Sequence, residues 1–119
     1  MKIAITAQGS TPESPVDQRF GRAYWMLFYD ESSQTWEALE NSAARNAVQG
    51  AGVQASRLVA ERGANVLITG VTGPKAYQTL NAAGIKIMHG ASGTVSETLQ
   101  AYRDGKLVEA DAASATGGS

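Results

Sequence analysis

The pattern of hydrophobic and polar positions predicts five strands. Residues 2–7 and 23–30 are strongly β-prone, and a short polar turn joins the second of them to residues 35–40, which predicts a hairpin. Residues 66–69 and 85–88 are short apolar runs with β-branched side chains. Such runs are typical of strands that are covered on both faces.

Apolar residues at helical spacing predict three helices, at 51–62, 74–83 and 94–104. The third helix begins with Thr94 followed three residues later by Glu97, which is the spacing of a capping box. Each helix is followed by a glycine, the residue that commonly ends a helix in the left-handed conformation. The predicted order is therefore three strands, then helix, strand, helix, strand and helix.

This order predicts an α/β fold with a mixed sheet. Crossovers through helices require the third, fourth and fifth strands to be parallel where they share a sheet, and the hairpin makes the second strand antiparallel to the third. If the first strand is parallel to the last three, the loops after these four strands meet at the carboxyl edge, where open α/β sheets usually bind ligands. These loops are residues 8–22, 41–50, 70–73 and 89–93.

Positively charged side chains are found in these loops. Arg19, Arg22 and Arg45 lie in the first two, and Lys75 lies in the first turn of the helix that follows residues 70–73. Helices that start after glycine loops present unpaired N–H groups, so an anion is the natural occupant of this edge. The arginines are then expected to contact the anion through their guanidinium groups.

Simpler structural roles are open for the same residues. The two arginines of the first loop could pin it through ion pairs with Asp17 or Glu13, and the glycines could be plain helix caps. His89 is expected to be a solvated loop residue, because a single imidazole cannot form an ordinary metal site. Met88 is expected to fill the core, although its thioether is a soft sulfur donor.

Composition limits the classes of function. The chain has 119 residues, 43% hydrophobic and 18% charged, which predicts one compact domain at 1–107 and a disordered tail at 108–119. The net charge of -1 argues against a protein that binds nucleic acid or a membrane surface. The first apolar run is too short for a signal peptide or a membrane span, so we expect a cytoplasmic protein, and we expect a monomer.

Recognisable catalytic motifs are missing from the sequence. The chain has no cysteine and one histidine, which excludes thiolate metal sites and a histidine-rich centre. Neither glycine loop matches the dinucleotide-binding or P-loop pattern, and no nucleophile elbow or HExxH motif occurs. We therefore expect a binding protein and not an enzyme.

Three stretches of sequence resemble a known family. SPVDQRFGRA at 14–23, EN at 40–41 and the segment from QGAG to GIKI at 49–87 closely resemble the dinitrogenase iron–molybdenum cofactor biosynthesis family. That family includes NifX- and NafY-type carriers, the C-terminal domain of NifB proteins and the Orange Protein of sulfate-reducing bacteria. The resemblance covers about residues 1–107 and implies a ribonuclease-H-like fold with a five-stranded mixed sheet and three helices.

The resemblance also implies a function, the non-covalent carriage of an anionic metal–sulfur cluster. Many nitrogenase-pathway members have histidine in the loop before GAG, whereas this chain has Arg45 to Gln49 there, so it is more similar to the Orange Protein branch. That branch implies a molybdenum–copper sulfide cluster held without cysteine ligands. A partner ATPase of the ParA or MinD type is also implied.

The resulting candidate site combines charge, backbone donors and an apolar wall. Arg19 and Arg22 would offset the negative charge, N–H groups near Gly50 to Gly52 and near Gly73 would donate to sulfides, and Phe20 with Met88 would form the wall. The alternatives are an iron–molybdenum cofactor carrier, a metal-independent module that docks an ATPase, and a small-anion enzyme for which no base or nucleophile is evident. The full set is Arg19, Phe20, Gly21, Arg22, Asn41, Arg45, Gln49, Gly50, Ala51, Gly52, Gly70, Gly73, Lys75, Met88 and His89.

Overall fold

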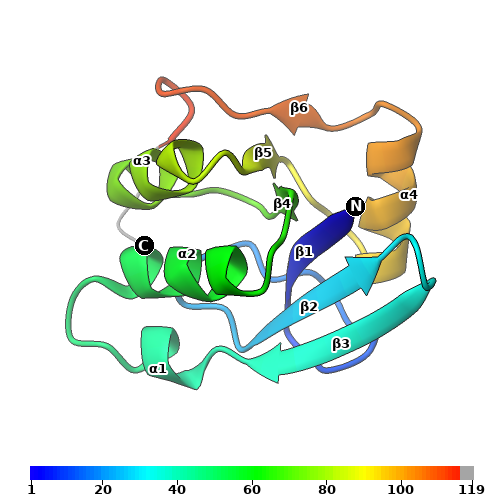
Figure 1. The fold of residues 1–119 in the computed structure, drawn as a ribbon, viewed down its shortest axis with the longest axis horizontal. Coiled ribbons are helices and arrows are strands. Elements are labelled where there is room, and N and C mark those ends of the chain that lie inside the picture. The colour runs from blue at the N-terminus through cyan, green and yellow to red at the C-terminus, as the bar shows by residue number, and fades with distance from the viewer. Residues whose placement is uncertain (116–119) are drawn as a thin grey trace.

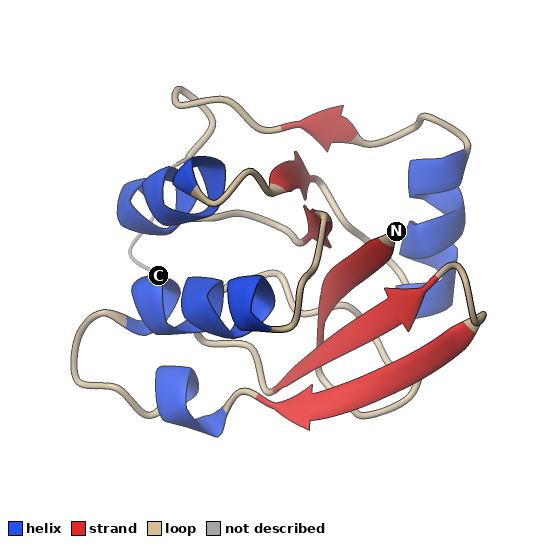
Figure 2. Ribbon diagram, in the orientation of Figure 1, coloured by secondary structure: helices blue, strands red, loops and turns tan. Residues whose placement is uncertain are grey.

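The computed structural model describes residues 1–115 as a mixed six-stranded sheet with helices on both faces (Figure 1). The strands lie in the order β3-β2-β1-β4-β5-β6. Figure 2 shows the long β2–β3 hairpin at one side of the sheet and the short last strand at the other. The strands are β1 (Lys2–Ala7), β2 (Trp25–Asp30), β3 (Thr35–Glu40), β4 (Val66–Ile68), β5 (Lys86–His89) and β6 (Val108–Glu109).

Strand directions confirm the predicted position of the loops. Strand β1 is parallel to β4, β4 is parallel to β5, and β2 is antiparallel to both β1 and β3. Strand β3 therefore runs in the same direction as β1, β4 and β5. The loops that follow these four strands accordingly leave the sheet at its carboxyl edge.

Two hydrophobic clusters cover the two faces of the sheet. Helices α2 (Ala51–Glu61) and α3 (Pro74–Ala82) pack on one face, where Ala55 and Leu80 belong to the same cluster as Phe28. Helix α4 (Val95–Arg103) packs on the other face, where Val95 and Ile5 belong to the second cluster. Side chains along each strand alternate between the two clusters because the side-chain period of a strand is two.

The structure has one helix and one strand more than the sequence predicted. Helix α1 (Ser42–Arg45) is a single turn inside the segment expected to be a loop. Strand β6, at Val108–Glu109, pairs antiparallel with β5, and the Ala110 N–H donates to the Ile87 carbonyl at 2.8 Å. This pairing depends on the edge of β5, so local sequence could not reveal it. The expected disordered tail is thus paired at its beginning, and residues 116–119 lie outside the described part of the chain.

Candidate functional site

The segment Arg19–Arg22 lies across the starts of α2 and α3. At one end Arg19 forms an isolated parallel bridge with Val71, in the loop that leads into α3. At the other end Gly21 lies directly against the backbone of Gly52, in the first turn of α2. Four residues therefore connect the two helix starts along the carboxyl edge.

Two glycines allow this close approach of backbone to backbone. A Cβ atom on Gly21 would lie 2.8 Å from the Gly52 nitrogen, and one on Gly70 would lie 2.7 Å from the Cα of Gln18. Real Cβ contacts are essentially never this short, so a side chain at either position would push the loop away from its neighbour. The glycine loops are therefore more than helix caps.

The helix starts at this edge differ in how their N–H groups are used. Neither α2, which follows Gly50 in the left-handed conformation, nor α3, which has Pro74 in its first turn, has a side-chain cap. Helix α4 is closed by the predicted capping box of Thr94 and Glu97. The N–H groups of α4 at residues 95 and 96 also donate to carbonyls of the first loop, at 2.9 Å each. Helix α1 (Ser42–Arg45) also has no side-chain cap, but it is a single turn. Of the longer helices in the described part of the chain, α2 and α3 therefore present starts without a side-chain cap to a ligand.

The three arginines of the candidate site are used in different ways. The Arg22 Nη1 donates to the carbonyls of Arg45 and Ala47, at 2.7 and 2.8 Å, so this side chain holds the end of α1. The Arg45 guanidinium stacks 3.8 Å above the ring of Tyr24. Arg19 has a 58% exposed side chain that contacts Asp17 through Nε alone, at 3.5 Å. The Arg19 fork is consequently the most available of the three.

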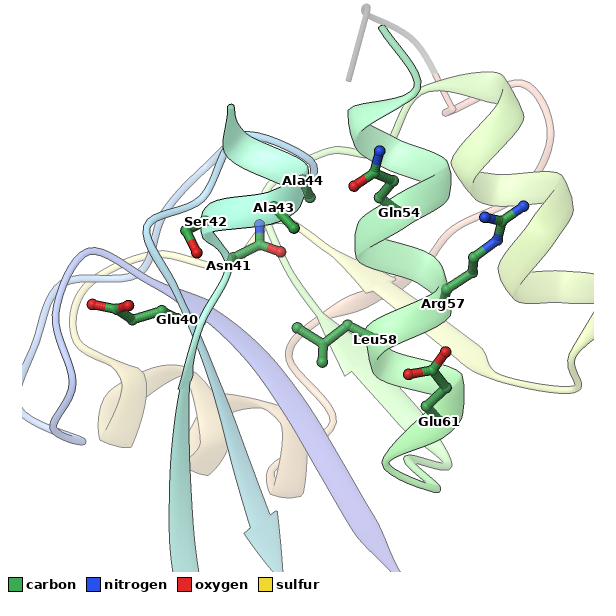
Figure 3. Close-up of a pocket in the computed structure, with 9 residues that line it drawn as sticks. All are labelled: Glu40, Asn41, Ser42, Ala43, Ala44, Gln54, Arg57, Leu58 and Glu61. Carbon is green, nitrogen blue, oxygen red and sulfur yellow. The ribbon is translucent and has the colours of Figure 1, made fainter. Parts of the chain in front are cut away.

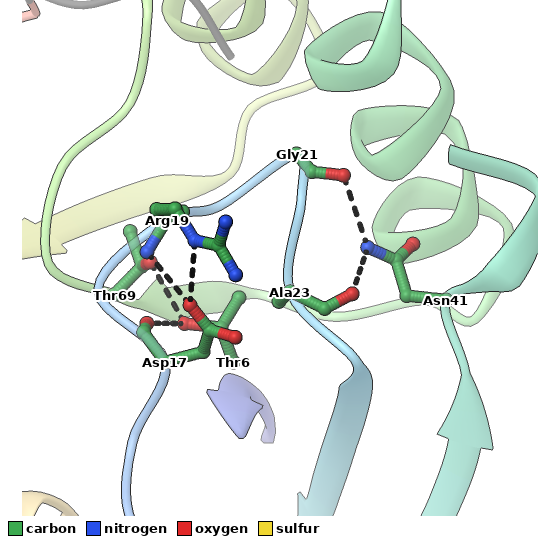
Figure 4. Close-up of polar contacts among 7 residues, drawn as sticks. All are labelled: Thr6, Asp17, Arg19, Gly21, Ala23, Asn41 and Thr69. Carbon is green, nitrogen blue, oxygen red and sulfur yellow. Dashed lines mark hydrogen bonds and ion pairs between the residues drawn. The ribbon is translucent and has the colours of Figure 1, made fainter. Parts of the chain in front are cut away.

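The buried amide of Asn41 fixes the other end of the Arg19–Arg22 segment (Figure 4). Asn41 is 1% exposed, and its Nδ2 donates to the carbonyls of Gly21 and Ala23, at 3.3 and 3.1 Å. These bonds hold the turn after Arg22 against the end of β3. Asn41 therefore has a structural role at this edge, and its amide nitrogen is already engaged.

His89 is not the solvated loop residue that the sequence predicted. It ends β5 with 8% of its surface exposed, and its Nε2 accepts from the Thr72 N–H at 3.2 Å and lies 2.9 Å from the Thr72 hydroxyl. An accepting Nε2 requires the neutral ring. Burial lowers the pKa of His89 below its ordinary value of 6.5, and the carboxylate of Asp111 opposes this shift. The imidazole therefore holds the loop before α3 as a neutral acceptor.

Stability should accordingly fall with acidification. Because the folded pKa of His89 is lowered, the unfolded chain binds more protons, so the free energy of unfolding decreases as the pH falls below 6.5. Urea unfolding between pH 7.5 and 5 measures this slope. His89→Gln keeps an acceptor near the Nε2 position and should flatten the slope, since the chain has no other histidine. An equal slope in the variant would contradict the assignment.

Phe20 and Met88 do not form the expected apolar wall. Phe20 is 0% exposed in the cluster beneath α2 and α3, whereas Met88 is 6% exposed in the cluster beneath α4. The two side chains lie in separate clusters and fill the core. This placement confirms the core-filling interpretation of Met88.

The remaining predicted residues follow the helix starts. Gln49 and Gly50 are exposed before α2, and Lys75 is exposed in the first turn of α3. Ala51 and Gly52 are buried at the start of α2. Gly73, which precedes α3, is buried as well.

Sequence reasoning missed two residues that join the loops at this edge. The backbone carbonyl of Gln18 accepts from the Val71 N–H at 3.1 Å, and its side-chain Nε2 donates to the Ala91 carbonyl at 2.7 Å. Thr72 engages His89 as described above. Neither residue stands out in the sequence, because a polar side chain in a loop gives no sign of its distant partner.

The described residues also form a cavity between α1 and α2, beside the end of β3 (Figure 3). It has a volume of about 330 Å³ and side chains of both charge signs, including Arg57 and Glu61. Among the predicted site residues only Asn41 contacts it. Arg19 and the residues that begin α2 and α3, at 50–52 and 73–75, do not line this cavity.

The groups available at the carboxyl edge limit the kind of ligand that the candidate site can bind. Within residues 1–115 no group of three or more His, Asp or Glu side chains could hold a metal ion, and the chain has no cysteine. None of the described helices is long and apolar enough to cross a membrane. The fold and this edge define a mixed α/β protein whose ligand site would offer N–H donors and a guanidinium to an anion.

Comparison with known proteins assigns the chain to a family. Residues 1–105 match the dinitrogenase iron–molybdenum cofactor family, and the chain belongs to it. The apo form of the orange protein from Desulfovibrio gigas is similar in structure, with 41% identity, a TM-score of 0.88 and 92% of each chain covered. A NifB-like protein from Thermotoga shares 33% identity with a TM-score of 0.80 over 91% of each chain. An uncharacterized protein of Methanocaldococcus jannaschii is 34% identical over 90% of this chain and 89% of its own length. These relatives support a role in cofactor binding or carriage.

Proposed function

We propose that the chain binds and carries an anionic metal–sulfur cluster of the molybdenum–copper sulfide type without covalent attachment. The site is the carboxyl edge at Arg19–Arg22 and the starts of α2 and α3. One observation carries the proposal: two uncapped helix starts are connected by a glycine-dependent segment with an exposed arginine fork. Each helix start contributes about 0.3–1 kcal/mol toward binding a negative charge.

The absence of thiolates from this edge agrees with such a guest. A metal sulfide unit brings its own sulfur ligands and exposes sulfides that carry negative charge and accept N–H hydrogen bonds. The protein then has to supply only donors, positive charge and exclusion of water. The carriage of a preformed cluster fits a chain with no cysteine better than the assembly of a cluster on protein ligands.

The placement of His89 favours this guest over the iron–molybdenum cofactor. A carrier that ligates a cofactor through histidine needs an accessible ring nitrogen. The single histidine of the chain is buried, and its Nε2 is engaged by Thr72. We propose that the protein acts as a cytoplasmic monomer. The alternative function is docking of a ParA- or MinD-type ATPase without a metal cluster.

Titration of the metal-free protein with tetrathiomolybdate and then copper(I) tests the site. Strong visible charge-transfer bands should appear, and Arg19→Ala should weaken tetrathiomolybdate binding about tenfold, which corresponds to roughly 1.4 kcal/mol. Arg19→Lys, which keeps the charge without the fork, should lie between. The matched control is Arg57→Ala, which removes an exposed arginine from the cavity between α1 and α2.

Two results would count against the proposal. Unchanged uptake in Arg19→Ala would remove the assigned site. Binding of an ATPase of the ParA or MinD type by rigorously metal-free protein, without any uptake of the cluster components, would favour the docking function instead. Arg22 is left unmutated because its guanidinium holds the end of α1.

A further inference from the structure

The buried carboxylate of Asp17 lies next to Arg19, the exposed arginine of the proposed site. Asp17 is 3% exposed, and its backbone is fixed on both sides: its N–H donates to the Thr6 carbonyl at 2.9 Å and its carbonyl accepts from the Thr6 hydroxyl at 2.7 Å (Figure 4). The Thr6 hydroxyl also lies 2.8 Å from that of Thr69. The position of Asp17 is therefore set by the ends of β1 and β4.

The two oxygens of this carboxylate are used unequally. Oδ1 accepts from the Arg19 N–H at 3.0 Å and lies 3.5 Å from the Arg19 Nε. Oδ2 is buried and accepts no hydrogen bond from the described residues. A buried polar atom without a partner is unfavourable for folding, so its retention in a binding loop calls for a functional explanation.

Charge and geometry favour a competitive role for Asp17 over a positioning role. Its contact with the Arg19 side chain is a single long one, and that side chain is 58% exposed, so the contact orients the fork only weakly. The carboxylate itself is buried and its backbone is held by Thr6, so its negative charge stays beside the site when an anion binds.

We propose that Asp17 limits the affinity of the site for its anionic guest. In the empty protein it partly neutralises Arg19, and in the loaded protein it repels the guest, which keeps binding reversible. The inference rests on the proposed function, since it concerns the same site. A carrier that must release its cargo needs such a limit.

Asp17→Asn tests this role with tetrathiomolybdate alone as the probe. The amide oxygen can still accept from the Arg19 N–H, so the loop is kept while the charge is removed. We expect about tenfold tighter binding with slower release, and a gain that shrinks as the salt concentration rises because its origin is electrostatic. A purely structural role would not produce this salt dependence.

Asp30→Asn is the matched control at the opposite edge of the sheet. The Oδ1 of Asp30 accepts from the N–H two residues ahead, Ser32, at 2.9 Å, which is the same local bond that Asp17 makes. The change in net charge is identical, so affinity should stay at the wild-type value. If Asp17→Asn fails to fold, Asp17→Ser offers a neutral acceptor for the same N–H and carries the same expectation.

The outcomes separate this inference from the proposed function. If the wild type binds and Arg19→Ala weakens binding, but neutral variants at Asp17 bind equally or more weakly, the competitive role is wrong and the site stands. A salt-independent gain would also overturn it. If the wild type takes up no tetrathiomolybdate at any ionic strength, both proposals fail together.

Discussion

Gly21→Ala is expected to lower the free energy of unfolding by about 2 kcal/mol and to abolish tetrathiomolybdate uptake. The new Cβ would lie 2.8 Å from the Gly52 nitrogen and 3.0 Å from the Gly52 Cα. Both are backbone atoms in the first turn of α2, so they cannot rotate away. Overpacking of this kind typically costs 1–3 kcal/mol, and the restricted unfolded chain returns only about 0.5 kcal/mol. The loop must therefore move away from the helix start.

Gly9→Ala is the matched control for this substitution. Gly9 lies in the same long loop, and its added Cβ would meet the Ser14 side chain, with 3.1 Å to the Ser14 Cβ. The Ser14 hydroxyl can rotate away at the cost of its bond to the Thr11 N–H, and no helix backbone is involved. We expect a loss of stability of about 1 kcal/mol and normal uptake. Urea unfolding with paired titrations measures both quantities. Wild-type stability in Gly21→Ala would show that the loop and α2 are less closely packed than the structure indicates.

The elements at the centre of the fold could be predicted from the sequence because their signals are local. The apolar run at residues 66–69 and the capping box at Thr94 depend only on neighbouring residues, and the structure confirms a strand at Val66–Ile68 and the capping box. The positions of the loops at the carboxyl edge follow from the order of elements and the rules for crossovers. Strand β6 and helix α1 could not be predicted, because each depends on a distant partner, the edge of β5 and the Arg22 side chain respectively.

The candidate site was predicted less completely than the fold. The sequence placed charges and glycines in the loops of the carboxyl edge, but it could not tell which arginine side chain is engaged by other groups of the protein. Arg22 and Arg45 are indistinguishable from Arg19 by residue type, yet one binds carbonyls and the other stacks on Tyr24. Side-chain partners across the sheet edge are long-range properties, so hydrophobic periodicity carries no information about them.

Burial is the second property that composition could not assign. His89 follows an apolar strand and precedes a glycine, which is typical of an exposed loop, whereas the structure buries it against Thr72. Asp17 has the same property, since a carboxylate in a polar loop is expected to be solvated. Both residues support the loops that contain the proposed site. The ion pair of Arg19 with Asp17 was among the roles that the sequence allowed, but the burial of the carboxylate was not recognisable from its neighbours.

Asn41→Ala is expected to lower the free energy of unfolding by about 3 kcal/mol. The amide donates to two carbonyls, those of Gly21 and Ala23, while Asn41 itself is 1% exposed. Truncation leaves both acceptors without their donor in a buried place, and each such loss costs roughly 1–3 kcal/mol. Water that enters the space can donate to the two carbonyls and recover part of this free energy, so the expected loss stays below the sum of the two upper values.

The effect of Asn41→Ala on binding follows from the position of the two carbonyls. They bracket Arg22, so release of this turn should loosen the Arg19–Arg22 segment and weaken tetrathiomolybdate binding even where the protein remains folded. Asn46→Ala, which removes an exposed amide at the end of α1, should change neither quantity by much. Unfolding curves establish the fraction folded before each titration. A destabilised but folded Asn41→Ala that binds with wild-type affinity would show that the anion does not depend on this segment, because the helix starts alone would then be sufficient to hold it.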